Sequence, residues 1–343
     1  MKDFIFMVMF FMRKNEYNTN IRSTFYIFKR FKIFKLIQIL IISFIIIKSN
    51  IWNEQKLFYK EDKKKLKVCL CVIGKKENLY AREFVDYYRK IGYNNIFIYD
   101  NNEINDEQFE DVINNEIKEG FVKIINFRGY KGSKGQPQFD AYLDCYEKNN
   151  KKYDWLSFFD FDEFLEFKPI NITIQDFLSN NRFKNCLNVK INWLWYINNN
   201  SLYYENKPIQ ERVTFPLYGS QYNLHIKSTI RGNLSMNYWL NMKNPHSSLN
   251  NFNSCSSSGQ HISYSTPFIK PPDYKYAILK HYHNKSFEEY CMKILRGRAD
   301  TNNANLKKAI QHLFENNKYD IRKLNIMKRI FNISFHSLER NKK

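Results

Sequence analysis

The sequence lacks a hydrophobic run of the length that crosses a membrane unaided. Its most apolar stretch, residues 36–47, is interrupted only by Gln38 and Ser43, whereas a spanning helix needs about 20 residues. Residues 31–35 add apolar side chains and lysines that can reach the interface, and the basic residues before 36 would hold the amino end in the cytoplasm. We therefore expect a single-pass signal anchor at 31–50 (of the endoplasmic-reticulum or Golgi type in a eukaryote), between a basic segment at 1–30 and a polar stem at 51–66. A cleaved signal peptide, or an amphipathic surface helix on a cytoplasmic, membrane-associated protein, is the alternative.

Cysteine is scarce and scattered. The only close pair, Cys69 and Cys71, has strand spacing, which suits neither a zinc knuckle nor a local disulfide. We expect the cysteines to be small buried apolar side chains. If the folded domain is lumenal, one or two long-range disulfides are the alternative, and the sequence does not assign them. The six positions are Cys69, Cys71, Cys145, Cys186, Cys255 and Cys291.

Acidic residues are too few to balance the basic ones, which gives a formal net charge of +20. Residues 1–65 carry +9 of this excess and residues 301–343 carry +7. A folded nucleic-acid reader places its basic residues on a docking face within a recognisable motif, so this distribution excludes nucleic acid as the expected partner. Hydrophobic residues make up 43% and aromatic residues 17% of the chain, which is enough for a sizeable core and excludes global disorder.

Strand and helix patterns alternate from residue 66 onward. Buried-strand patterns cover 66–74, 95–101, 121–127 and 153–165, and helical patterns cover 83–92, 106–118 and 138–149. This alternation predicts an α/β fold with a mostly parallel, doubly wound sheet and flanking helices. After about residue 185 the pattern changes to aromatic strands and polar loops, and it becomes helical again from 286 to the end.

Two acids follow the apolar strand that ends near residue 160. Asp160 and Asp162 come after Trp155, Phe158 and Phe159, and carboxylates that leave an apolar strand are costly unless they are paired or bind a cation. At a strand end, two acids spaced i and i+2 can reach one hard cation, such as Mg²⁺ or Mn²⁺, that substrate phosphates complete. A solvated acidic turn or a helix N-cap is the alternative, because this triplet also occurs by chance.

Histidines follow a later strand in the same way. His281 and His283 stand where the apolar segment from 277 enters a polar turn, and their spacing puts both rings on one face. One or both rings can add a nitrogen ligand to the cation; a hydrogen-bonded core histidine is the alternative. Trp193 and Trp195 can stack on a sugar face or can belong to an aromatic core.

The ordered landmarks of the chain resemble glycosyltransferase family 92 and its bacterial relatives, which are related to the family 2 enzymes with the GT-A fold. The resemblance covers residues 67–300 and leaves 301–343 as a basic helical tail. One departure is Lys76, where family members usually have asparagine. The landmarks are Glu77 in GKKENLYAREFVDYYRKIGYNNIFIYDNN, Gln138 with AYLDCY at 141–146, WLSFFDFDEFL at 155–165, Glu211-Arg212, Lys227 in IKSTIRG, His246, and HYHNKS to RGRA at 281–299.

The resemblance implies a GT-A domain that transfers a sugar from a nucleoside-diphosphate sugar to a glycan or another hydroxyl acceptor. The donor it implies is a UDP-sugar, with galactose as the leading sugar, and the cofactor is Mn²⁺ or Mg²⁺. A catalytically inactive protein on this fold that binds carbohydrate or nucleotide-sugar is the alternative. The residues that match are Asp160, Asp162 and His281 for the metal, and Glu77, Asp100, Gln138, Arg212 and Lys227 for the donor.

The resemblance also implies inversion at the anomeric carbon, so a carboxylate must take the proton of the acceptor hydroxyl. Glu211 is the first candidate for this base. Glu163 and Asp273 are rivals, and spacing does not decide among them.

Overall fold

The computed structural model describes residues 66–133, 135–197, 200–234, 253–262, 267–297 and 306–332. The expected basic segment, the anchor at 31–50, the stem up to residue 65 and the landmark His246 lie outside this part. Within it, none of the helices combines the length and the apolar character that crossing a membrane requires.

Four parallel strands form the first half of the sheet, in the order β3-β2-β1-β4. They and the helices between them lie where the sequence pattern predicts them, which confirms the alternation. These elements are β1 (Val68–Gly74), α3 (Asn78–Lys90), β2 (Asn95–Asp100), α4 (Glu110–Lys118), β3 (Val122–Asn126), α5 (Pro137–Asn149) and β4 (Trp155–Phe158).

Beyond β4 the sheet is mixed, so the expectation of a mostly parallel sheet holds only for its first half. β8 is antiparallel to β4 and β6 is antiparallel to β8, while β11 runs parallel to β6 and antiparallel to β5. The described helices of this region before β11 have at most five residues, too short for a helical crossover, and β4, β8 and β6 follow one another as antiparallel neighbours. The elements are β5 (Glu163–Phe167), α6 (Ile174–Leu178), β6 (Asn188–Ile197), α7 (Ile209–Arg212), β7 (Phe215–Pro216), β8 (Ile226–Arg231), β9 (Ser254–Cys255), β10 (His261–Ile262) and β11 (Ala277–His281), with 3₁₀ turns η1 (Asn181–Phe183) and η2 (Gln221–Leu224).

The apolar segment 153–165 is two strands rather than the single strand that its pattern indicates. β4 ends at Phe158, a turn follows, and β5 begins at Glu163. The two strands pair with different neighbours, because β4 joins β1 and β8 whereas β5 joins β11. Asp160 and Asp162 therefore lie in the turn between two strands.

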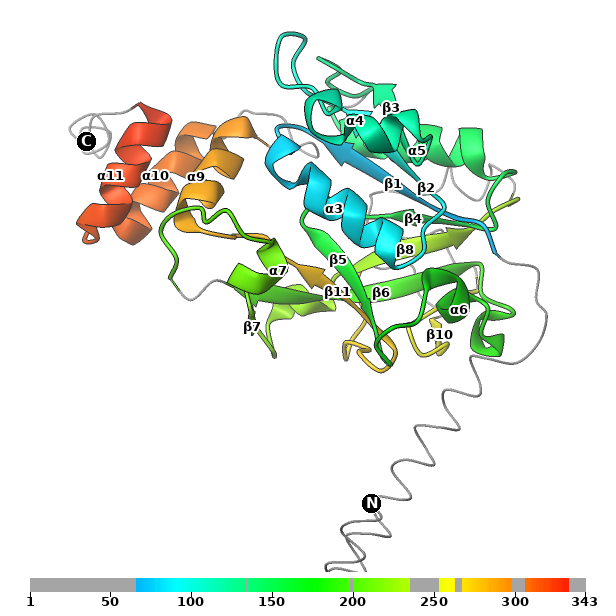
Figure 1. Ribbon diagram of the computed structural model, residues 1–343. Helices are drawn as coiled ribbons and strands as arrows, with labels where there is room; N and C mark the ends of the chain where they lie inside the picture. Colours follow the sequence, from blue (N-terminus) through cyan, green and yellow to red (C-terminus); the bar gives the residue numbers. More distant parts are fainter. Residues whose placement is uncertain are drawn as a thin grey trace, which may run out of the picture. The chain divides into compact units, whose positions relative to one another are not determined.

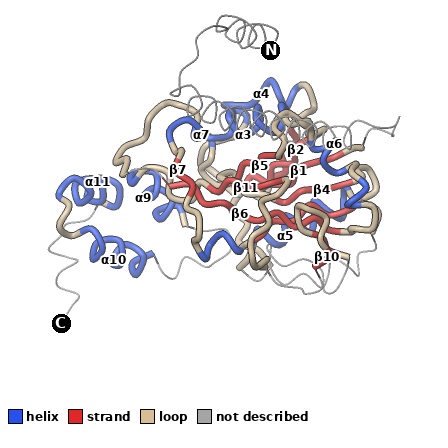
Figure 2. Tube along the Cα trace, turned by 90° about the horizontal axis from the view of Figure 1, so that it is seen from below, coloured by secondary structure: helices blue, strands red, loops and turns tan. Residues whose placement is uncertain are grey.

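Helices cover both faces of the parallel strands. Figure 2 shows α3 and α4 on one side of β1 and β4 and α5 on the other. The core under α5 contains Cys69, Cys71 and Tyr142. Three carboxyl-terminal helices, α9 (Phe287–Arg296), α10 (Leu306–Asn317) and α11 (Ile321–Phe331), lie together in both views (Figure 1) and share a small core around Cys291 and Met327. Their positions confirm the helical region expected from residue 286.

Two long-range disulfides join elements that the sheet brings together. Cys71 on β1 is bonded to Cys145 on α5, and Cys186 is bonded to Cys255 on β9. The other two, Cys69 and Cys291, are buried free thiols. The expectation of small buried side chains therefore holds for these two, and the long-range alternative holds for the other four.

Removing the Cys71–Cys145 disulfide by Cys71→Ala/Cys145→Ala should lower the free energy of unfolding by about 4 kcal/mol. The bond closes a loop with a sequence separation of 74, and its loss frees the unfolded chain. Denaturant titration measures the change, and Cys291→Ala is the control, because it removes a buried sulfur that crosslinks nothing. Equal midpoints for the double variant and the native protein would contradict the crosslink.

Candidate functional site

The turn between β4 and β5 is anchored by a buried phenylalanine. Phe161 is 2% exposed and its ring packs against Phe84 and Phe109. A Cβ placed on Gly74, at the end of β1, would lie 2.6 Å from this ring, so only glycine leaves room for it there. With Phe161 fixed in the core, the acids on either side of it contact other groups of residues, although Asp162 is buried as well.

Strand pairing brings the second acid to the histidines. β11 pairs antiparallel with β5, with His281 opposite Glu163, and the backbone N–H of Tyr282 donates to the carbonyl of Asp162 at 2.8 Å. One ligand atom from each of Asp162, His281 and His283 lies within 4.8 Å of the others. We call these three residues the Asp162 cluster.

The Asp162 cluster has the donor atoms and protonation states that suit a divalent cation. Burial lowers the pKa of His281, so the ring is neutral, and its Nδ1 atom is buried without a hydrogen-bond partner in the described part of the chain. Burial alone would raise the pKa of Asp162, but Lys293 and His281 beside it hold that pKa well below its usual range. One carboxylate and two imidazoles suit Mn²⁺ better than Mg²⁺, because Mg²⁺ takes oxygen ligands almost exclusively.

An internal cation lies within the Asp162 cluster. The ammonium of Lys293, on α9, donates to Oδ2 of Asp162 at 2.7 Å and lies 3.0 Å from Nδ1 of His283. A metal ion held by all three ligands would share this carboxylate and this ring with Lys293.

Asp160 belongs to a different group of residues. Its Oδ2 accepts from Lys227 at 2.8 Å, and its Oδ1 accepts from Gln138 at 2.6 Å and from Tyr142 at 2.9 Å. The structure therefore brings three of the expected site residues together, namely Asp160, Gln138 and Lys227. The expected role of Gln138 and Lys227 in binding the donor stays a prediction. A metal role for Asp160 stays a prediction, because it is outside the group of three ligands.

Glu163 shares the ammonium of Lys227 with Asp160. Lys227 on β8 is fully buried, and its Nζ lies 3.7 Å from Glu163 Oε2. Burial raises the pKa of Glu163 well above its usual range, and the Asp160 and Asp162 charges add to the rise although Lys227 opposes it. A buried acid that holds its proton is poorly suited to act as a base.

The two acids expected at the nucleoside lie near the carboxyl end of the parallel strands. Asp100 ends β2 opposite Gly74 and is paired with Arg128 at 2.6 Å. Glu77 precedes α3 and is paired with Arg296 of α9. Lys76, where the family usually has asparagine, has φ +54°, and this left-handed region favours asparagine over lysine.

Arg212 is committed to a protein carboxylate. It forms a bidentate pair with Glu289 at 2.6 and 2.7 Å, and both side chains are buried. Its neighbour Glu211 is exposed on α7. Asp273 accepts from the backbone of Ser258 and Lys275, so it holds a loop.

Replacing Glu289 should reduce the loss of free energy of unfolding that the native protein shows as pH falls. Burial alone would raise the pKa of Glu289, but hydrogen bonds from Arg212, Ser286 and Tyr80 lower it to about 2. A lowered folded-state pKa gives stability that is complete above the usual pKa near 4.5 and is lost as pH falls from there toward 2. Between roughly pH 6 and pH 3 the native protein should lose about 2 kcal/mol more than Glu289→Gln. Parallel denaturant curves at several pH values measure this; equal slopes against pH would contradict it.

The two tryptophans pack on the histidines. The ring centroid of Trp193 lies 4.1 Å from that of His281, and Trp195 stacks on His283 at 5.0 Å and on Tyr222 at 4.3 Å. They orient the imidazoles, and stacking on a sugar face stays a prediction.

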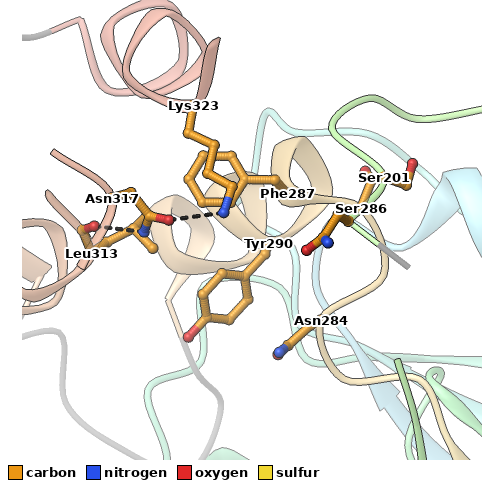
Figure 3. Close-up of a pocket in the computed structure, with 9 residues that line it drawn as sticks. Ser201, Asn284, Ser286, Phe287, Tyr290, Leu313, Asn317 and Lys323 are labelled. Carbon is orange, nitrogen blue, oxygen red and sulfur yellow. Dashed lines mark hydrogen bonds between the residues drawn. The ribbon is translucent and has the colours of Figure 1, made fainter. Parts of the chain in front are cut away.

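Two pockets adjoin the end of β11 and share Asn284. The first, of about 230 Å³, is lined by His283 and Lys293 of the site together with Lys76 and Tyr80; we call it the basic pocket. The second, of about 220 Å³, lies among α9, α10 and α11, with Phe287 and Tyr290 on its wall (Figure 3). Sequence reasoning missed Lys293 and the other residues that α9 contributes, although α9 lies within the landmark stretch 281–299.

Residues 64–324 match the sequence profile described as glycosyltransferase family 92. The chain belongs to glycosyltransferase family 92. A family 92 protein of Oryza sativa subsp. japonica is 32% identical over 113 residues, which cover 33% of this chain and 18% of that protein. The chain thus spans less than a fifth of the length of this curated relative.

The structure of this family 92 chain is similar at low identity to S. aureus TarS. The likeness to TarS has 12% identity, covers 74% of this chain and 44% of that chain, and has a TM-score of 0.34. The likeness to residues 1–349 of TarS in complex with UDP has 13% identity, covers 81% and 75%, and has a TM-score of 0.34.

Proposed function

We propose that this family 92 protein transfers a sugar from a UDP-sugar to a hydroxyl acceptor on a glycan, with Mn²⁺ in the Asp162 cluster and inversion at the anomeric carbon. The observation that carries the proposal is the cluster itself, which stands beside the basic pocket. The UDP complex of TarS is consistent with the donor class, and galactose follows from the family resemblance alone.

The residues of the site divide the work. Asp162, His281 and His283 would hold the ion, which when bound neutralises charge on the departing diphosphate. Trp193 and Trp195 fix the two imidazoles. Of the carboxyl groups considered as base, Glu163 is buried with a raised pKa and Asp273 holds a loop, which leaves Glu211 on α7.

The test is release of UDP by the full chain with a panel of UDP- and GDP-sugars and mixed acceptors, with Mn²⁺ or Mg²⁺. We expect UDP release with Mn²⁺ and much less with Mg²⁺, and Mn²⁺ binding in electron paramagnetic resonance independently of turnover. A chain that binds neither Mn²⁺ nor any donor would refute the proposal.

A binding protein without catalysis is the second candidate, and the position of Lys293 favours it, because an ammonium already neutralises Asp162. Donor binding without turnover for any acceptor would establish this alternative.

For location we propose a membrane protein with its amino end in the cytoplasm and its folded domain in an oxidising compartment. The anchor rests on the sequence pattern, and the two disulfides support the compartment, because such bonds persist where the medium is oxidising. Thiol titration of the unsubstituted protein, unfolded in denaturant without reductant, should find two free thiols. Six free thiols would count against an oxidising compartment.

A further inference from the structure

Of the cationic side chains that line the basic pocket, all but one have a carboxylate partner. Arg296 is paired with Glu77 and Lys293 with Asp162, and Lys76 lies 3.3 Å from Asp106. The exception is Lys285. Among the described residues, it has no hydrogen-bond or ion-pair partner for its ammonium.

Lys285 is buried although it carries this charge. The residue is 5% exposed, and its ammonium lies 3.1 Å from the ring centroid of Tyr80. The hydroxyl of Tyr80 donates to Glu289, which Arg212 also holds, so the ring is fixed. An aromatic face compensates only part of the cost of removing an ammonium from water.

The backbone at Lys285 has an unfavourable conformation that its neighbours hold in place. Its φ of +46° lies in the left-handed region, which is unfavourable for a lysine. His281 ends β11 on one side, and on the other Ser286 begins α9 with a reciprocal hydrogen-bond pair to Glu289. Because both neighbours are fixed, the side chain is locked into the pocket wall.

The cations that the sequence suggested for a diphosphate are already committed. Arg212 is bound to Glu289, and Lys227 is fully buried with Asp160 and Glu163. An anionic ligand beside the Asp162 cluster therefore needs another cation. The basic pocket offers Lys285, which lines it together with His283.

We infer that Lys285 binds the diphosphate of the nucleotide donor in the basic pocket, an inference that rests on the proposed function. Phosphate oxygens are strong acceptors for an ammonium, so the ligand supplies the partner that the protein does not. His283 and Lys285 both line this pocket, so one diphosphate can lie against the metal ligands and this lysine together. Lys285 is a binding residue; no bond is made or broken at it.

The test compares Lys285→Met with Lys76→Met in the full chain with Mn²⁺. Methionine keeps the length of the side chain and removes the charge. Lys76 lines the same pocket and has the same left-handed backbone, but it is half-exposed and has Asp106, so it is the matched control. Calorimetry or thermal shift gives the affinities for UDP, UMP, uridine and inorganic pyrophosphate.

Lys285→Met should weaken UDP binding by at least about tenfold, the size expected for one charged hydrogen bond, and should leave uridine binding within about twofold. Lys76→Met should leave both within about twofold. The melting temperature of the ligand-free Lys285→Met variant should not fall, because removing an unpaired buried charge relieves its desolvation; a purely structural lysine would lower it.

Equal UDP affinity in Lys285→Met and the native protein would overturn the inference and leave the proposed function standing. If the native protein binds no UDP, the proposed function fails; pyrophosphate binding that Lys285→Met abolishes would still support the anion site. A native protein that binds neither ligand would overturn both.

Discussion

Asp162→Asn should lower the rate of sugar transfer by about a thousandfold, or about 4 kcal/mol of transition-state stabilisation. The substitution keeps the shape of the side chain and removes the only carboxylate of the Asp162 cluster. The two imidazoles would remain, and they bind Mn²⁺ more weakly than the complete set. The native protein should therefore bind Mn²⁺ well and the variant poorly.

Initial rates of UDP release at high Mn²⁺ and Mn²⁺ titration by electron paramagnetic resonance measure the two effects separately. Glu166→Gln is the control, because it removes an acid of β5 whose partner, Lys280, lies away from the cluster. Asp160→Asn should weaken Mn²⁺ binding less than Asp162→Asn, because Asp160 is held by Lys227, Gln138 and Tyr142. Unchanged Mn²⁺ affinity in Asp162→Asn would remove the cluster as the metal site.

Lys227→Met should lower the free energy of unfolding by about 3–5 kcal/mol. The variant leaves Asp160 and Glu163 inside the protein without their cation. Burial lowers the pKa of Lys227, but the neighbouring acids raise it overall, so this ammonium is charged and offsets the charge of Asp160. An uncompensated buried carboxylate is among the most destabilising changes that one substitution makes.

Denaturant titration gives the change, with Lys280→Met as the control for a lysine paired at a less buried position. Adding Asp160→Asn to Lys227→Met should restore part of the loss, because the carboxylate that lost its cation is then neutral. A double variant as unstable as the sum of the single variants would show that the ammonium does not stabilise the charge of Asp160.

Local sequence was sufficient where one residue pattern determined one element. The strands β1, β2 and β3 and the helices between them follow from apolar periodicity. The turn at residues 159–162 did not follow, because a run as apolar as 153–165 fits one strand or two equally well. Only the pairing of β4 with β8 and of β5 with β11 distinguishes them.

The sequence by itself determined the residue types of this site: carboxylates after an aromatic strand, histidines after a later one, and a family whose landmarks stand in order. The tertiary structure alone decided which of them meet. Asp162 meets the histidines because β11 pairs with β5, whereas Asp160 and Arg212 are bound by Lys227 and Glu289. Charge partners are chosen by distance in the folded chain, as for Lys293 and Asp162, which are 131 residues apart, and spacing along the sequence carries no information about such pairs.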